Sequence, residues 1–532
     1  MDQLRQIKAP KASRWGRVRR GTAAGRQVSV LLVMVMLGAV AGAQADEPGL
    51  AAERHEYGQT AMGVEVRIVL HGNDDGQVAA AAEAAFERIH KLDELLSDYR
   101  VDSQLSRLGA GPMGEAQAAP QLVPFLARAE ELSEATDGAF DVTAGPLVKL
   151  WRRAREEGRL PAERDVEQAR SSVGWRLLGI DRAAGTVSLG KEGMALDVGG
   201  IGKGFAADEA GRILRAAGFN SFLIDLGGDL LLGAAPPGRD GWTIQAGSSE
   251  TPAQSRLLVL SDCGVATSGD TYQYMEVDGV RYSHIIDPRT GQALRDQVCV
   301  TVVAPDGATA DALASAACVL GPRAARRCLS AIEDVRLLVE RPGFLPVFDG
   351  ETLDGWTTRG GRYDGNALWT VEDGAITGRE GPGGAGGLLY TERAYADLEL
   401  ELEMRISWPF DSGIFPRMVP DKKGVQLTID YRPGGEVGGV YSEGFLQHNK
   451  DGLEQFKRDS WNHFELRLTG AEMHLEAWMN GAPLCDYRLP EDGEFRSGFA
   501  RAGLLGLQVH GSAGAPEGSV VQFRDIRIRE LP

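Results

Sequence analysis

His284 lies in the stretch of this sequence whose residue types best suit proton transfer. The stretch is YSHIIDPRTG, residues 282–291, in which a β-type run from Tyr282 to Ile286 stops at Asp287-Pro288 and a turn follows. The strand end fixes the backbone and the turn leaves room for a substrate, so a histidine here suits a proton acceptor. The same pattern also fits a buried, hydrogen-bonded histidine beside a β-turn.

A second stretch, LDVGGIGKGFAAD at residues 196–208, places four glycines at the start of a predicted helix that runs to about Ala217. Glycines let backbone amides approach a ligand closely, and a helix N-terminus favours a phosphate. Lys203 adds a positive charge suited to phosphate oxygens. The Walker pattern is absent from this stretch, so a purely structural turn is the alternative interpretation.

Asp311 and Ser315 are four residues apart in TADALASAACVL, residues 309–320, a predicted helix with Thr309 as its candidate N-cap. They share one face of that helix. A carboxylate and a hydroxyl facing a phosphate-binding turn could hold Mg²⁺ together with the oxygens of a ligand. Alternatively, the helix dipole favours the aspartate and the serine belongs to a packing face of small residues.

These residues need a scaffold, and hydrophobic periodicity indicates its elements. Alternation over Val64–Leu70 predicts a half-buried strand, and Gln77–Leu96 reads as an amphipathic helix. A second helix is predicted over Leu122–Ala135, closed by Asp137-Gly138. Further predictions are strands at Ser221–Leu226 and Val298–Ala304, a helical turn at Asp102–Leu108 and a charged, exposed segment at Arg152–Arg170.

Length and composition limit the classes of protein. A chain of 532 residues suggests several domain-sized units, and 43% hydrophobic with 25% charged residues is an ordinary globular balance. The net charge of −18 argues against nucleic-acid binding. The five cysteines form no CxxC pair, so neither a zinc site nor a redox motif is indicated.

Residues 1–45 are predicted to be an export signal. Several arginines precede the apolar run Val28–Val40, and Ala43-Gln44-Ala45 offers a cleavage site before Asp46. We therefore expect an exported, periplasmic protein, with association to the inner membrane through an uncleaved segment as the alternative. Arg19-Arg20 leaves Sec and twin-arginine export both open.

The pattern of the sequence changes after Arg341-Pro342-Gly343. Short alternating runs follow one another and are separated by turn signals, which predicts a two-sheet β-sandwich without long helices. The expected organisation is a signal at 1–45, a domain at 46–343 and a sandwich domain at 344–532. The predicted strands include Leu398–Ile406, Val425–Tyr431, His463–Leu468 and Val520–Arg529.

Taken together and in order, motifs over about residues 55–340 resemble the FAD:protein FMN transferases, the ApbE-like flavin transferase family. The resemblance implies an α+β (α/β) N-terminal flavin transferase domain. The motifs are AMG at 61–63, the segment 99–108, TDGAFDVT at 136–143, LDVGGIGKG at 196–204, LGGD at 226–229, TSGD at 267–270, SHIIDPRTG at 283–291 and TADAL at 309–313.

The resemblance also implies an activity and roles for individual residues. Such enzymes transfer FMN from FAD, their substrate, to a threonine hydroxyl of an exported acceptor protein, release AMP and require Mg²⁺. His284 would accept the proton of the threonine, and the metal would be held by the Gly200 carbonyl, Asp311 and Ser315, where many relatives have threonine. The residues implied to line the FAD site are Met62, Tyr99, Ala139, Phe140, Asp141, Asp197, Lys203 and Ile285.

The C-terminal third resembles the concanavalin-like jelly-roll domains of the 3-keto-disaccharide hydrolase-like family. This implies an all-β jelly-roll sandwich and a carbohydrate as ligand or substrate. The expected role is carbohydrate binding or hydrolysis. Relatives usually have asparagine where this chain has Asp411, so no catalytic residue is carried over to this unit. The motifs are FDGETLDGW at 348–356, WTVEDGAITG at 369–378, DLELELEMRI at 397–406, DSGIFPR at 411–417, GGVY at 438–441, WNHFELRL at 461–468 and WMNG at 478–481.

The sequence therefore leaves three hypotheses about the function of the protein. The first is a magnesium-dependent flavin transferase with an accessory sandwich. The second is an FAD-binding or FAD-hydrolysing protein that does not transfer FMN, and the third is a carbohydrate-active protein with a passenger flavin domain. His284, Asp311 and Lys203 together favour the first over the second.

Overall fold

The computed structural model describes two compact units, of which the first ends at Arg341 and the second begins at Pro342. Sequence analysis places this boundary between residues 343 and 344. The structure describes residues 5–6, 52–97, 100, 102–110, 114–247, 256–269, 273–407, 410–430, 432, 434–511, 516 and 518–532. Apart from residues 5–6, the predicted export signal therefore lies outside the described residues.

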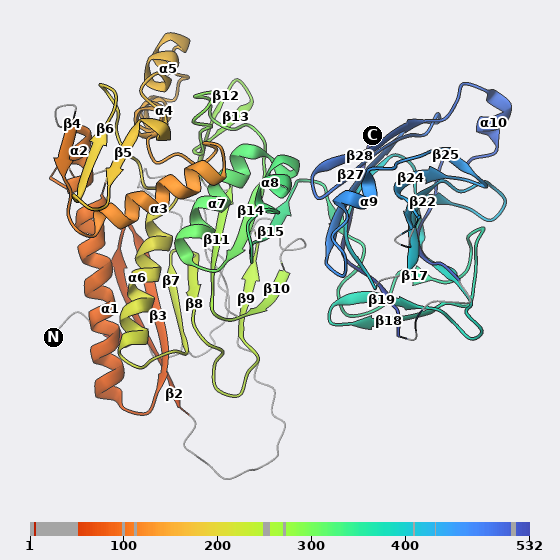
Figure 1. Cartoon of the computed structure of the whole chain (residues 1–532), viewed down its shortest axis with the longest axis horizontal. Coiled ribbons are helices and arrows are strands. Elements are labelled where there is room, and N and C mark those ends of the chain that lie inside the picture. The colour runs from red at the N-terminus through yellow and green to blue at the C-terminus, as the bar shows by residue number, and fades with distance from the viewer. Residues whose placement is uncertain are drawn as a thin grey trace, which may run out of the picture. The chain divides into compact units, whose positions relative to one another are not determined.

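The first unit is built on an antiparallel sheet whose strands do not all follow their order in the chain (Figure 1). Its strand order is β1-β2-β3-β7-β8-β11-β14-β15, so strands distant in sequence become neighbours at its centre. The strands are β1 Arg5–Gln6, β2 Glu53–Ala61, β3 Val64–Gly72, β7 Phe222–Leu226, β8 Asp229–Leu232, β11 Cys263–Gly269, β14 Cys299–Ala304 and β15 Arg336–Glu340.

Helices α1 (Asp75–Leu96), α6 (Gly202–Ala216) and α7 (Gly307–Leu320) lie side by side on this sheet (Figure 1). Helix α1 begins where the Asp74 carboxylate accepts the amides of Gly76 and Gln77, which satisfies donors that the first turn leaves unpaired. Its apolar stripe is buried as the sequence predicts. The buried residues are Val78, Ala81, Ala82, Ala85, Phe86, Ile89, Leu92 and Leu96.

Helices α6 and α7 approach each other closely because two glycines meet at their contact. A Cβ at Gly204 would lie 2.1 Å from the Gly307 carbonyl oxygen, and a Cβ at Gly307 would lie 2.6 Å from the Gly204 carbonyl oxygen. The Asp208 carboxylate of α6 accepts the amides of Gly307 and Ala308 at 2.7 and 2.9 Å. This contact fixes the N-terminal turn of α7 against α6.

Helix α4 (Gly145–Glu157) is fastened to the predicted histidine segment. Trp151 Nε1 donates to the Gly291 carbonyl at 2.9 Å, and its indole stacks on Tyr282 with centroids 6.0 Å apart.

The other elements of this unit are α2 Gln104–Ala110, β4 Gly114–Gln117, α3 Leu122–Ala135, α5 Glu163–Arg170, β5 Leu178–Asp181, β6 Thr186–Leu189, β9 Trp242–Ala246, β10 Arg256–Leu260, β12 Tyr274–Val277, β13 Val280–Ser283 and α8 Pro322–Leu329, with a 3₁₀ turn at Trp175–Leu177.

The second unit is a β-sandwich, which confirms the predicted all-β class. One sheet has the order β18-β19-β30-β21-β26-β27-β28 with β16 on β30, and the other has the order β17-β20-β29-β22-β23-β24-β25. An apolar core of residues from both sheets lies between them.

The strands of the second unit are short to medium in length. They are β16 Leu345–Pro346, β17 Trp356–Thr357, β18 Leu368–Glu372, β19 Ala375–Arg379, β20 Gly387–Tyr395, β21 Leu398–Ile406, β22 Asp411–Met418, β23 Gln426–Asp430, β24 Val437–Tyr441, β25 Phe445–Gln447, β26 Asn462–Thr469, β27 His474–Met479, β28 Ala482–Arg488, β29 Gly503–Val509 and β30 Val521–Glu530. The helices α9 (Gly452–Gln455) and α10 (Gly493–Ser497) are single turns.

Two local predictions were wrong. The strand expected over Tyr282–Ile286 ends at Ser283, and the residues after it pair with the segment that follows the turn, where the Leu294 amide donates to the Ile285 carbonyl and Ile286 forms an isolated bridge with Ala293. The N-cap expected at Thr309 is Asp306, whose carboxylate accepts both the amide and the hydroxyl of Thr309 at 2.7 and 2.6 Å. An aspartate three residues upstream thus takes the capping role in place of the threonine.

Within the part of the chain that the structure describes, no helix is both long enough and apolar enough to cross a membrane.

The α6–α7 contact predicts a steric test. Gly204→Ala should lower the free energy of unfolding by about 1–3 kcal/mol or more, because the new methyl group meets backbone atoms that cannot rotate away. Thermal unfolding of the full-length protein measures the effect. Gly493→Ala is the matched control, since nothing lies within 4 Å of a Cβ there. Equal melting temperatures for both variants would contradict this account of the contact.

Candidate functional site

Asp311 is a buried carboxylate at the contact between α6 and α7. It exposes 4% of its surface, and its Oδ2 accepts the Gly204 amide at 3.2 Å. Burial raises the pKa of Asp311, the nearby Asp229 raises it further, and Lys203 acts in the opposite direction. The carboxylate therefore lies where the N-terminus of α6 and one ammonium favour its charge, while burial opposes that charge.

Lys203 lies between the acidic groups of this site. Its ammonium forms an ion pair with Asp229 of β8, and about a third of the lysine side chain remains exposed. Partial burial disfavours the lysine charge, but Asp229 and Asp311 outweigh that effect and raise the pKa of Lys203. Lys203 is therefore a permanent cation at the start of α6.

Gly200 and Ser315 meet at the same place. A Cβ at Gly200 would lie 2.9 Å from Ser315 Oγ, so the absent side chain is what lets the hydroxyl approach this backbone turn. Ser315 Oγ is also 3.3 Å from Ser268 Oγ of β11. The structure thus brings together the three predicted metal ligands, Gly200, Asp311 and Ser315, around the N-terminus of α6.

The donor set of these residues fits a hard divalent cation. A carbonyl, a carboxylate and a hydroxyl are all oxygen ligands, which Mg²⁺ prefers. The buried pair Asp229 and Asp311 faces the single ammonium of Lys203, so the acidic groups are only partly neutralised. A cation with several remaining positions for phosphate oxygens matches this arrangement.

His284 presents a nitrogen suited to accepting a proton. Its Nδ1 lies 3.1 Å from the Gln273 carbonyl oxygen, which can only accept, so Nδ1 carries the hydrogen and Nε2 has the lone pair. The imidazole lines a recess with Trp151, Arg152 and Arg155 of α4, and solvent reaches its ring. The recess also includes Val148, Met275, Tyr282, Ser283 and Ile286.

The surroundings of His284 keep its ring neutral. Partial burial lowers the pKa of His284 below its ordinary value of 6.5, and the positive charges of Arg155 and Lys203 act in the same direction, against the bond to Gln273. The Lys203 charge therefore influences both His284 and Asp311.

Several residues predicted to line the FAD site lie near the same helix terminus. Met62, with φ of 51°, donates its amide to Asp93 at 2.8 Å, and its Cε is 3.6 Å from where a Cβ would lie at Gly202. Phe140 approaches the Gly200 turn, with a ring carbon 3.6 Å from the Cβ position there. Tyr99 lies outside the described residues.

The remaining predicted residues have mainly internal contacts. Asp141 accepts the Thr143 amide and hydroxyl and the Trp175 amide at 2.7–2.9 Å, so its carboxylate organises the loop that holds the buried Ala139. Burial raises the pKa of Asp141 in spite of these bonds. Asp197 accepts the Gly199 amide at 3.0 Å, and Ile285 packs against the main core.

Sequence reasoning missed Asp229, Ser268, Arg152 and Arg155 as site residues. Asp229 and Ser268 lie in the LGGD and TSGD motifs, and these motifs are the sequence signal by which both residues could have been found. The segment with Arg152 and Arg155 was predicted to be merely charged and exposed. Its helix is instead anchored by Trp151, and these two arginines lie one turn apart beside His284.

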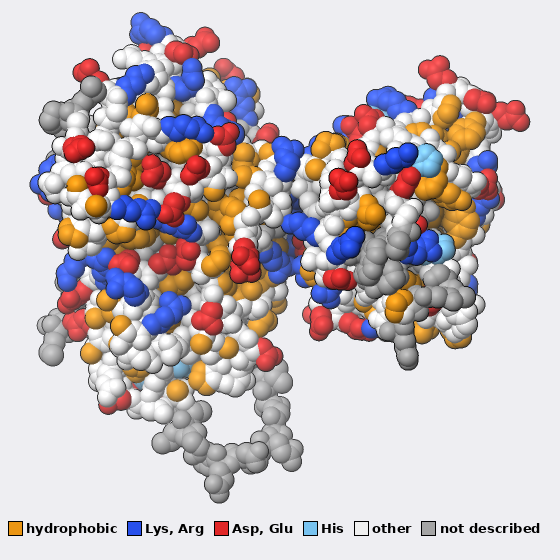
Figure 2. All heavy atoms as spheres, viewed as in Figure 1, with side chains coloured by type: hydrophobic (Ala, Val, Ile, Leu, Met, Phe, Trp, Pro, Cys, Tyr) orange, Lys and Arg blue, Asp and Glu red, His pale blue; other side chains and the backbone are white. Residues whose placement is uncertain are grey.

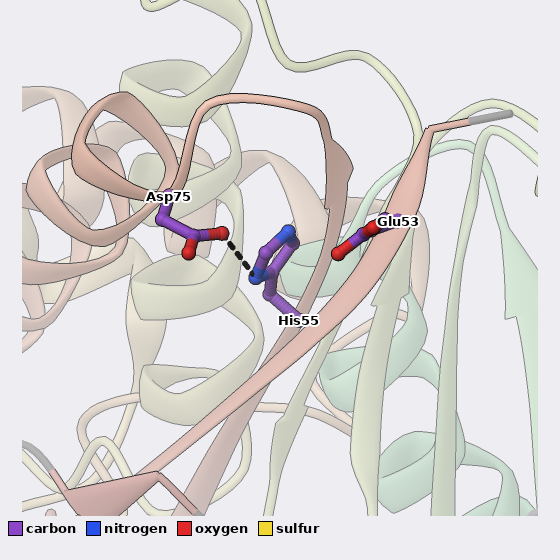
Figure 3. A group of neighbouring side chains, drawn as sticks. All are labelled: Glu53, His55 and Asp75. Atoms are coloured by element: carbon purple, nitrogen blue, oxygen red, sulfur yellow. Dashed lines mark ion pairs between the residues drawn. The ribbon is translucent and has the colours of Figure 1, made fainter. Parts of the chain in front are cut away.

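A separate group of potential ligands, Glu53, His55 and Asp75, lies at the corner between β2 and α1 (Figure 3). His55 exposes 7% of its surface, and its Nε2 is 3.0 Å from the Gly72 carbonyl oxygen. Its Nδ1 is 3.7 Å from Asp75 Oδ1. This geometry suits an imidazole that joins β3 to α1, and we assign it a structural role.

Comparisons with known proteins identify the first unit. The ApbE family model matches residues 62–339, just over half of the chain, and a 3-keto-alpha-glucoside-1,2-lyase-like domain model matches residues 343–529. The FAD:protein FMN transferase of Treponema pallidum (strain Nichols) is 36% identical over 266 residues, which are 46% of this chain and 72% of that protein. The one of Escherichia coli (strain K12) is 31% identical over 280 residues, 50% of this chain and 78% of that protein.

The chain is also similar to a solved structure. The apo form of the flavinyl transferase ApbE of Pseudomonas stutzeri is 27% identical, with a TM-score of 0.49, and covers 56% of this chain and 92% of that one. The chain belongs to the ApbE family. It is an enzyme of the flavin transferase class, an FAD:protein FMN transferase that also has a C-terminal sandwich unit.

The electrostatics of His284 can be measured directly. Because its pKa is lowered, the ring should stay neutral as pH falls through 6.5 and take up its proton only below that value. NMR titration of the full-length protein, with His284→Gln to assign the resonance, should give a pKa below 6.5. Arg155→Gln should move that pKa upward, while Arg153→Gln, on the exposed side of α4, should leave it unchanged. A value of 6.5 or above in the wild type would contradict the proposed surroundings.

Proposed function

We propose that this enzyme transfers FMN from FAD to a threonine hydroxyl of an exported acceptor protein, with Mg²⁺ and release of AMP. The observation that supports this most strongly is the grouping around Lys203. The oxygen ligands at Gly200, Asp311 and Ser315 lie around the N-terminus of α6, where Lys203 is located, and the Lys203 charge also lowers the pKa of His284, whose Nε2 is available.

The proposed reaction is a phosphoryl-type transfer in which atoms balance. The threonine oxygen forms a bond to the phosphorus of the FMN half, and the bond from that phosphorus to the bridging oxygen breaks. The bridging oxygen leaves with AMP. His284 Nε2 accepts the proton of the threonine hydroxyl. A base is needed for this because a hydroxyl is a weak nucleophile at neutral pH.

The residues at the helix terminus support the charge that develops on the leaving group. Mg²⁺, when bound, supplies Lewis-acid stabilisation of the pyrophosphate oxygens. Lys203 contributes a fixed positive charge there, and its ion pair with Asp229 holds the ammonium in place before substrate binds. The amides at the start of α6 offer further donors to phosphate.

Export and a carbohydrate role for the second unit are also part of the proposal. The signal-like residues 1–45 favour a periplasmic location, where an exported acceptor would meet the enzyme. The match to the 3-keto-alpha-glucoside-1,2-lyase-like model favours a saccharide as the ligand of residues 343–529.

The role of His284 predicts a specific loss. His284→Ala should reduce labelling of acceptor by about a hundredfold or more, as expected for removal of a general base. The assay incubates the full-length protein with FAD, MgCl₂ and cell-envelope proteins, detects flavin fluorescence in a denaturing gel and locates FMN on threonine by mass spectrometry. His474→Ala, which removes a contact with Asp486 in the second unit, is the control. Undiminished labelling by His284→Ala would exclude this residue as the base.

The same incubation separates transfer from hydrolysis. Wild-type protein that produces free FMN and AMP without labelled acceptor would support the FAD-hydrolysing alternative and overturn the proposed transfer.

The proposed metal ligands lead to a prediction about stabilisation of the protein by magnesium. In the full-length protein, MgCl₂ together with FAD should raise the melting temperature, because a ligand that binds only the folded state stabilises it. Asp311→Asn should abolish the magnesium-dependent part of that rise, since an amide in place of the buried carboxylate removes its negative charge. Ser315→Thr should retain it, because the hydroxyl oxygen survives. An unchanged magnesium response in Asp311→Asn would remove Asp311 from the metal set.

A further inference from the structure

Ser268 lies near the end of a strand that is paired on both sides. Strand β11 has β8 as one neighbour and β14 as the other, and its ladder with β14 extends to Gly269. Helix α7 packs on β11 (Figure 1). The Ser268 carbonyl accepts the Cys318 thiol at 3.4 Å, so α7 is fastened to the strand one turn after Ser315. Backbone pairing therefore holds Ser268 at a defined position against α7.

The Ser315 hydroxyl of α7 is oriented differently from that of another buried helical serine in this chain. A serine inside a helix can donate to the carbonyl four residues earlier. Ser133 of α3 does so, with its Oγ 2.8 Å from the Ala129 carbonyl oxygen. The Ser315 Oγ instead lies 3.3 Å from Ser268 Oγ and next to the Gly200 turn. Because serine is not β-branched, its χ1 is less restricted than that of threonine, and the contact with Ser268 selects this orientation.

The chemistry of a metal-bound hydroxyl explains why the partner of Ser315 matters. A hydroxyl that binds a cation uses an oxygen lone pair, so its hydrogen has to point toward another acceptor. Ser268 Oγ is an acceptor at hydrogen-bonding distance from Ser315. With the hydrogen directed to Ser268, the lone pairs of the Ser315 oxygen stay available to a cation.

We propose that Ser268 is a positioning residue for the metal site, which accepts the hydrogen of the Ser315 hydroxyl and so directs the Ser315 oxygen toward the cation. The inference rests on the proposed function, in which Gly200, Asp311 and Ser315 hold Mg²⁺. It adds a residue from β11, a strand that contributes none of these three ligands. Magnesium affinity then depends on the contact between β11 and α7 as well as on the contact between α6 and α7.

Magnesium titrations of the melting temperature of the full-length protein, at saturating FAD, test this role. Ser268→Ala should raise the MgCl₂ concentration at the midpoint of the temperature rise about fivefold, which is the loss expected from one ordinary hydrogen bond. Ser268→Thr retains a hydroxyl and should keep the midpoint close to the wild-type value. Melting temperatures in EDTA report any separate effect of a variant on the stability of the fold.

Thr267→Ala is the matched control. Thr267 Oγ1 lies 2.9 Å from Thr301 Oγ1 of β14, so this variant removes a contact between two hydroxyls from the opposite face of the same strand. It should leave the magnesium midpoint unchanged. Acidic side chains also lie on the surface of the first unit, interspersed with Lys and Arg (Figure 2), and Asp311→Asn measures any weak magnesium binding by them.

The flavin labelling assay separates metal affinity from the transfer step. Labelling of acceptor by Ser268→Ala should fall at limiting MgCl₂ and recover at high MgCl₂, because His284, the proposed base, is unchanged. Labelling that stays low at every MgCl₂ concentration would contradict a role in metal affinity.

The remaining outcomes distinguish failure of this inference from failure of the proposed function. A wild-type midpoint in Ser268→Ala, or an equal increase in Thr267→Ala, would overturn the positioning role while the proposed metal ligands stand. A midpoint in Ser268→Thr as high as in Ser268→Ala would show that the hydroxyl is not what matters. A wild type that responds to magnesium no more than Asp311→Asn would overturn the proposed metal site itself, together with the inference that rests on it.

Discussion

The close contact between α6 and α7 is the constraint on which the flavin transferase site depends. Gly204 and Gly307 meet backbone to backbone, and Asp208, one turn further along α6, accepts the first amides of α7. Only at this separation can the Gly204 amide reach Asp311 while Lys203 reaches Asp229. Any side chain at the contact would separate the helices and move the carboxylate away from the cation that balances it.

The same contact brings together more negative than positive charges, which the stability of the fold does not require. Two buried carboxylates, Asp229 and Asp311, share one lysine, and burial together with the nearby Asp229 raises the pKa of Asp311. Burying acidic groups that are incompletely paired costs stability. Perturbed carboxyl groups of this kind cluster at functional sites, where a bound cation or substrate completes the charge balance. We interpret the imbalance as the physical basis of the predicted metal affinity.

Sequence reasoning predicted the elements whose signals are local. The apolar stripe of α1 and the alternation of β21 are periodic within one segment, so both elements were predicted within a few residues of their observed bounds. The helix contact at Gly204 and Gly307 joins positions about a hundred residues apart and depends on packing, which no local pattern encodes. Arg155 was missed for the same reason, since only the anchoring of α4 through Trp151 shows that this charged helix borders the site.

Glycine has the same physical role in both units, which explains why glycine-rich motifs were informative. At Gly200 the missing side chain admits the Ser315 hydroxyl, and at Gly413 it admits the amide of Gln426. In each case a polar group of a neighbouring element occupies the space that a Cβ would take. At Gly493, by contrast, nothing lies within 4 Å of the position that a Cβ would take, so this glycine makes room for no neighbouring group.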